Sequence, residues 1–170
     1  MSHDIALRPV TTEDAAQLVD IYNHFIATST VTFDEAAWDI DAMVHKIHAI
    51  HDKGLPFLVV EIDGILAGYG YLSSWRDKSA FDRTAENTLY LRPEFQGMGA
   101  GGRLLDALLH EGQTAGIREV IAVITDSDDA AGSIALHTAR GFESVGTMPN
   151  VGYKFERWLG VVMMQKSLRD

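Results

Sequence analysis

The sequence predicts an α/β (α+β) protein in which about seven strands and about four helices follow one another as β-α-α-β-β-β-α-β-α-β-β. Three observations support this prediction. Apolar residues recur at helical spacing in several segments, whereas shorter apolar runs bounded by turn residues are typical of strands. Asp63-Gly64 joins two such runs in the manner of a β-hairpin. Gly54 and Gly141 end two of the helical segments.

Each element is placed by its apolar pattern and its flanking residues. Thr11 marks the start of the first helix, because a threonine cap is followed there by acidic residues. The other helices are predicted over residues 38–52, 99–114 and 133–139. The predicted strands are residues 5–8, 57–62, 65–72, 84–91, 120–124, 142–145 and 158–165.

A glycine-rich loop, Q-G-M-G-A-G at residues 96–101, connects strand 84–91 to the next helix. Glycine lets the backbone adopt positive φ and approach a ligand closely. The first turn of a helix offers unpaired N–H groups and the positive end of the helix dipole. The loop therefore predicts a pyrophosphate site built from backbone donors.

The same glycines also satisfy the dinucleotide pattern G-x-G-x-x-G through Gly97, Gly99 and Gly102, with Asp126 after an apolar strand further on. In that fold the strand runs almost directly into the first glycine, whereas residues 92–96 intervene here. The preceding segments are predicted hairpin strands, and too little chain follows for a second half-sheet. The pattern as a whole therefore disfavours a dinucleotide fold.

The composition of the 170 residues is ordinary for one globular domain, which we expect to span residues 1–170. A formal net charge of −10 argues against nucleic-acid and anionic-membrane partners, so an anionic cofactor must be held by local donors. The absence of cysteine excludes disulfides, thiolate metal sites and a cysteine nucleophile. No membrane-spanning run and no secretory leader are found, so a cytoplasmic protein is expected.

Three histidines, His45, His48 and His51, lie on one predicted helix. The third is rotated by about 240° from the first, so the three do not share a face. No acidic pattern completes a set of ligands, and no metal site is expected.

The glycine loop fits Q/R-x-x-G-x-G/A through Gln96, Gly99 and Gly101, and so resembles the GNAT superfamily of N-acetyltransferases. Further segments resemble the phosphinothricin acetyltransferase group within this superfamily: Y-N-H at 22–24, W-R at 75–76, Phe81, T-A-E-N-T-L-Y at 84–90, A-V-I at 122–124, L-H at 136–137, G-F at 141–142 and V-G-Y-K-F-E-R-W at 151–158. Some members of this group act on methionine sulfoximine and methionine sulfone, and M-P-N-V-G at 148–152 is more similar to that branch.

This resemblance implies the GNAT fold, a central mixed, mostly antiparallel sheet of about seven strands flanked by about four helices. It implies a homodimer that moves an acetyl group from acetyl-CoA to the α-amine of a small amino-acid analogue, without a metal. Cofactor contacts are expected at Leu89, Tyr90, Leu91, Gln96, Gly97, Met98, Gly99, Ala100, Gly101 and Ser133. Substrate contacts are expected at Trp75, Arg76, Phe81, Asn87 and Thr88.

Two residues are candidates for proton transfer. Glu86 matches the catalytic acid of the group, and period-two alternation places it with Thr88 and Tyr90 on one strand face. His137 stands where many GNAT proteins have a general-acid tyrosine, and a histidine can accept or donate a proton near neutrality. Glu86 could instead be a solvated carboxylate, and His137 a packing residue of the short helix. Arg76 suits a carboxylate or phosphinate of the substrate, because a guanidinium pairs with oxyanions.

Two positions depart from the group. Asp82 stands where a second arginine is often found, and Arg83 follows it. Ala130 stands where an asparagine usually contacts the pantetheine arm, so either Asp128 or Asp129 replaces that contact or the contact is lost. Two alternative functions remain: acetyl transfer to another amine, such as a polyamine, an aminoglycoside or a protein N-terminus, and a non-catalytic acyl-CoA-binding module.

Overall fold

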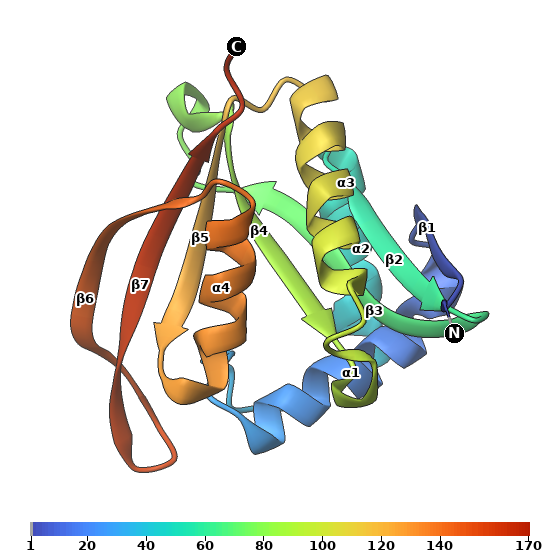
Figure 1. Ribbon diagram of the computed structural model, residues 1–170, viewed down its shortest axis with the longest axis horizontal. Coiled ribbons are helices and arrows are strands. Elements are labelled where there is room, and N and C mark those ends of the chain that lie inside the picture. Colours follow the sequence, from blue (N-terminus) through green and yellow to red (C-terminus); the bar gives the residue numbers. More distant parts are fainter. Residues whose placement is uncertain (1) are drawn as a thin grey trace.

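The fold is built on an open seven-stranded sheet in the order β1-β2-β3-β4-β5-β7-β6 (Figure 1). The computed structural model describes residues 2–170. Its strands are β1 Ile5–Pro9, β2 Phe57–Ile62, β3 Ile65–Ser74, β4 Thr84–Leu91, β5 Glu119–Asp126, β6 Glu143–Lys154 and β7 Arg157–Ser167. Neighbouring strands are antiparallel except β4 and β5, which are parallel. The predicted α/β (α+β) class with a mixed, mostly antiparallel sheet is therefore confirmed.

Helices cover both faces of this sheet. They are α1 Ala15–Thr28, α2 Ile40–Asp52, α3 Ala100–Thr114 and α4 Ala131–Ala139. The pair α1 and α2 packs on one face, and α3 and α4 pack on the other (Figure 1). Within the part of the chain that the structure describes, no helix has the length and apolarity that a membrane crossing requires.

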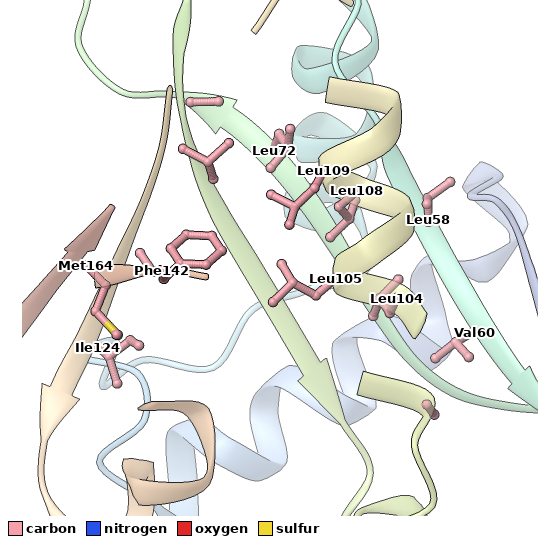
Figure 2. Close-up of a cluster of buried hydrophobic side chains, with 14 of the residues drawn as sticks. Leu58, Val60, Leu72, Leu104, Leu105, Leu108, Leu109, Ile124, Phe142 and Met164 are labelled. Atoms are coloured by element: carbon pink, nitrogen blue, oxygen red, sulfur yellow. The ribbon is translucent and has the colours of Figure 1, made fainter. Parts of the chain in front are cut away.

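Each face of the sheet has its own apolar core. The α3 helix presents Leu104, Leu105 and Leu108 to one face, where Figure 2 shows them among other buried side chains. Leu18 of α1 and Met43 of α2 belong to the core on the opposite face. Successive residues of β2 enter the two cores in turn, so this strand is apolar on both sides. Removal of this surface from water is the main force that holds the layers together.

Most predicted boundaries differ from the structure by one or two residues, and two differences have a clear physical reason. The second helix begins at Ile40 instead of residue 38, because the Asp39 side chain accepts a hydrogen bond from the Ala42 N–H at 2.8 Å and caps it. The strand predicted over 142–145 continues to Lys154 and forms a hairpin with β7. Its second half is exposed and contains Pro149 and Gly152, so no alternating pattern marked it as a strand.

The point that positions the functional site is the separation of β4 from β5. The two strands pair over three residues only, Thr84–Glu86 of β4 against residues 119–121 of β5. Beyond Glu86, β4 stays paired with β3 and β5 stays paired with β7. The two strands therefore diverge toward the glycine loop and the start of α4, as Figure 1 shows.

Candidate active site

A cavity of about 680 Å³ opens where β4 and β5 separate. This volume is within the range of small-molecule and cofactor sites. Its walls come from both strands, from the start of α3, from α4 and from the segment that connects α1 to α2. The predicted residues that line it are Glu86, Asn87, Thr88, Leu89, Tyr90, Leu91, Gln96, Gly97, Gly99, Gly101, Ser133 and His137. The predicted contacts Trp75, Arg76, Phe81, Met98 and Ala100 are not part of its wall.

The glycine loop has the backbone geometry of an anion site. Gly97 and Gly99 have φ angles of 78° and 86°, which side chains other than glycine rarely adopt. Gly99 is the N-cap residue of the 15-residue helix α3, and no side chain caps it. The N–H groups of the first turn are therefore free to donate to a ligand, and the helix dipole favours an anion there. This arrangement fits the diphosphate of a coenzyme A molecule.

Glu86 is half-buried and its side chain is on the sheet face that α1 and α2 cover. Burial raises the pKa of its carboxyl above the ordinary value, and the positive charges of Lys46 and Arg76 partly oppose this shift. A carboxylate with a raised pKa holds a proton more strongly than an exposed one, which suits a general base. The Glu86 carboxylate is therefore a candidate to accept a proton from a ligand in the cavity.

Cationic and aromatic side chains lie near Glu86, outside the cavity wall. The guanidinium of Arg76 is 4.9 Å from the ring centre of Trp75. The Lys46 Nζ is 5.3 Å from the ring centre of Tyr71, and Tyr71 is paired across the sheet with Thr88. Lys46 was missed from the sequence because one lysine on an amphipathic helix is usually solvated.

His137 is 2% exposed, and hydrogen bonds fix its protonation state. Its Nδ1 lies 2.7 Å from the carbonyl oxygen of Ser133, which can only accept, so Nδ1 carries the hydrogen and donates it. Its Nε2 then accepts from Nδ2 of Asn87 at 2.9 Å. Burial lowers the pKa of the ring, a shift that the Ser133 contact partly opposes, and this favours neutral imidazole. Both ring nitrogens are engaged within the protein.

Asn87 carries a free acceptor at the cavity wall. Its Oδ1 is buried and has no hydrogen-bond partner among residues 2–170. A buried oxygen without a donor is costly, so a ligand N–H that reaches it is favoured. The two amide N–H groups of a pantetheine arm have this chemistry, which is a second respect in which the cavity fits coenzyme A.

Glu86 and His137 lie on opposite sides of the sheet. Asn87, the residue next to Glu86, contacts His137, and successive side chains of a strand point to opposite faces. Both residues still line one cavity, because the gap between β4 and β5 opens the sheet at this level. They therefore do not form a hydrogen-bonded acid–base pair.

The segment between α1 and α2 is held by hydrogen bonds to three other parts of the chain. The Lys154 Nζ is buried and donates to the carbonyl oxygens of Ser29 and Thr32, at 2.9 Å each. Thr125 of β5 donates to the carbonyl oxygen of Thr30 at 2.6 Å. Thr30 in turn donates to Asp129 from its N–H and its hydroxyl, which lowers the pKa of that carboxyl. These contacts hold in place a segment that forms part of the cavity wall.

The two acidic residues before α4 differ in position. Asp129 lines the cavity, whereas Asp128 does not. Ala130 is buried and also lines the cavity. Within residues 2–170, no three histidine or acidic side chains are grouped in a way that would hold a metal ion.

Comparison with known proteins agrees with this geometry. The sequence profile of the acetyltransferase (GNAT) family matches residues 18–142. Phosphinothricin N-acetyltransferase of Alcaligenes faecalis is 38% identical over 95% of this chain and 82% of its own length. The L-methionine sulfoximine/L-methionine sulfone acetyltransferase of Salmonella typhimurium is 36% identical over 92% of this chain and 91% of its own. The structure of yncA from Salmonella typhimurium with its cofactor acetyl-CoA matches with a TM-score of 0.93 and 33% identity, over 98% of this chain and 95% of that one.

The chain belongs to the GNAT family of acetyltransferases. It is an acetyl-CoA-dependent acyltransferase, and acetyl-CoA is its cosubstrate. The expected fold, family and cosubstrate are thereby confirmed.

The protonation state of His137 can be measured directly. We expect ¹⁵N NMR of histidine-labelled protein to show neutral His137 at pH 7 with its hydrogen on Nδ1, because Ser133 accepts there and burial lowers the pKa below 6.5. The His137→Asn variant assigns the signal. Exposed His48 provides an internal comparison. A hydrogen on Nε2, or a titration midpoint above the ordinary value, would contradict the assignment.

Proposed function

We propose that the protein, as one GNAT domain, transfers the acetyl group of acetyl-CoA to the α-amine of a small amino-acid analogue of the phosphinothricin or methionine sulfoximine/sulfone type. The observation that carries this proposal is Glu86, a half-buried carboxylate at the cavity that is under the influence of two cations, Lys46 and Arg76. An amino-acid analogue has an amine that can give a proton to the Glu86 carboxylate, and an anionic group that can interact with Lys46 and Arg76. The names of the relatives support the same substrate class.

Glu86 is the general base in this proposal. An α-amine with a pKa of roughly 8 is mostly protonated at neutral pH, so it must lose a proton before it can attack. Bound acetyl-CoA supplies an acyl thioester. Glu86 takes this proton, directly or through water, and the neutral amine then attacks the thioester carbon. As the C–N bond forms and the C–S bond breaks, the sulfur leaves with the electron pair of the C–S bond, and the second proton of the nitrogen passes to the departing thiolate or to water. No covalent intermediate with the enzyme is needed, which agrees with the absence of cysteine.

His137 has a positioning role in this proposal. Its two nitrogens are engaged by Ser133 and Asn87, so it has neither a free lone pair nor a free N–H for the ligand. It holds the Asn87 amide so that Oδ1 is left for a donor in the cavity. Asn87 and Thr88 are the contacts that we assign to the reacting end of the ligands.

Replacing Glu86 tests the base. We expect Glu86→Gln to lower kcat by roughly 10²- to 10⁴-fold while the affinity for CoA is retained. In the native enzyme kcat/KM should rise with pH through the raised pKa of Glu86, because only the carboxylate accepts a proton. That rise should vanish in the variant. Glu111→Gln, an exposed change on α3, is the matched control. Unchanged kcat in Glu86→Gln would refute the assignment.

The substrate class is tested by thiol release from acetyl-CoA. Because the chain has no cysteine, a thiol-reactive dye reports only the CoA produced. We expect turnover of phosphinothricin, methionine sulfoximine and methionine sulfone, and little with spermidine or an aminoglycoside. Arg76→Met should raise KM for these three substrates by about tenfold, because it removes the counter-charge of their carboxylate. Arg83→Met is the matched control.

Turnover of cationic amines alone would overturn the proposed substrate class. Silence toward every amine, with CoA still bound, would instead favour a non-catalytic acyl-CoA-binding module. Equal KM values in Arg76→Met and Arg83→Met would show that Arg76 does not contribute to substrate binding.

We also propose that the enzyme is a homodimer through the β6–β7 hairpin. β6 is an edge strand, and exposed edges invite pairing with another chain. The large apolar side chains exposed on this hairpin are Val145, Met148, Val151, Tyr153, Phe155 and Trp158. Sedimentation velocity should give the mass of a dimer at micromolar concentration, and Trp158→Asp should shift it toward the monomer. A monomer in the native protein would contradict the proposal.

A further inference from the structure

We propose that Arg140 binds a phosphate group of the cofactor. This inference rests on acetyl-CoA binding alone and is independent of which amine the enzyme acetylates. Four observations on Arg140 and its surroundings carry it: the charge of the cavity, the place of the guanidinium, its unused donors and the nearby helix end.

Arg140 is the one arginine or lysine among the described residues that line the cavity. The other charged lining residues are acidic, Glu86 and Asp129, and His137 is held neutral by burial. The chain as a whole has a formal charge of −10 and repels a polyanion. Coenzyme A carries a diphosphate and a 3′-phosphate. A cavity that accepts it needs local positive charge, and Arg140 supplies it.

The guanidinium of Arg140 lies against the first turn of α3. A Cβ atom built at Gly102 would overlap the Nη2 atom of Arg140 and crowd its Cζ. The backbone at position 102 does not require glycine, because the residue lies within a regular helix and does not have a positive φ. The missing side chain at Gly102 therefore makes the space that the guanidinium occupies.

Most donors of Arg140 are unused within the protein. Its Nε donates to Oδ1 of Asp106 at 3.3 Å, a long contact with a side chain that is 60% exposed. Its two Nη groups make no hydrogen bond within residues 2–170. A guanidinium with free Nη groups at a cavity wall matches the tetrahedral oxygens of a phosphate.

Arg140 and the glycine loop lie at the same end of α3. Gly102 follows the N-cap residue Gly99 by less than one helical turn. The guanidinium and the free N–H groups of α3 therefore lie at the same end of the same helix. A phosphate that approaches this end meets backbone donors, the helix dipole and a side-chain cation together.

The test is the dissociation constant of CoA, and of 3′-dephospho-CoA, measured by titration calorimetry without any amine. We expect Arg140→Met to weaken CoA binding by about tenfold or more, since it removes charge-assisted hydrogen bonds. Arg103→Met, an exposed change on α3 with the same loss of charge, should change it by less than about twofold. If the loss disappears with 3′-dephospho-CoA, Arg140 contacts the 3′-phosphate. If it persists, Arg140 contacts the diphosphate.

Gly102→Ala is the second variant, because it displaces the guanidinium while retaining its charge. Alanine favours a helix more than glycine does, so a weakened affinity for CoA cannot come from loss of α3. We expect a loss of affinity between those of Arg103→Met and Arg140→Met. Equal dissociation constants for Arg140→Met and Arg103→Met would overturn the proposal, as would native affinity in Gly102→Ala.

Discussion

The rest of the site depends on the short parallel ladder between β4 and β5. After three paired residues the two strands follow different partners, β4 along β3 and β5 along β7. Each keeps its hydrogen bonds on its outer side, while backbone groups on the inner side are left for a ligand. The opening also connects the two faces of the sheet. For this reason residues from α1, α3 and α4 and from both cores can meet around one cavity.

Burial acts in opposite directions on the two titratable residues at this opening. It raises the pKa of Glu86, which keeps a proton more readily, and lowers that of His137, which stays neutral. The cations near Glu86 limit the first shift, and the hydrogen bonds of His137 fix one tautomer. The same physical cause thus underlies both proposed roles, proton acceptance by Glu86 and positioning of Asn87 by His137.

The segment between α1 and α2 shows how distant parts of the chain build one wall. Lys154 of β6, Thr125 of β5 and Asp129 before α4 all bind its backbone or Thr30. Buried carbonyl oxygens need donors, and the Lys154 ammonium supplies two of them. The hairpin β6–β7 therefore supports the active site from a distance and carries exposed apolar residues on its outer side.

Local signals in the sequence determined the element order, the glycine loop and the alternation that separates Glu86 from Asn87, because periodicity and glycine placement act over a few residues. Only the tertiary structure decided which side chains from distant parts of the chain contact these elements. Lys46 reaches the Tyr71 ring from α2, Arg140 reaches Gly102 from the C-terminal end of α4, and Asn87 contacts His137, which is 50 positions away in the sequence. Packing brings such residues together, and no local pattern encodes a contact between segments that are distant in sequence.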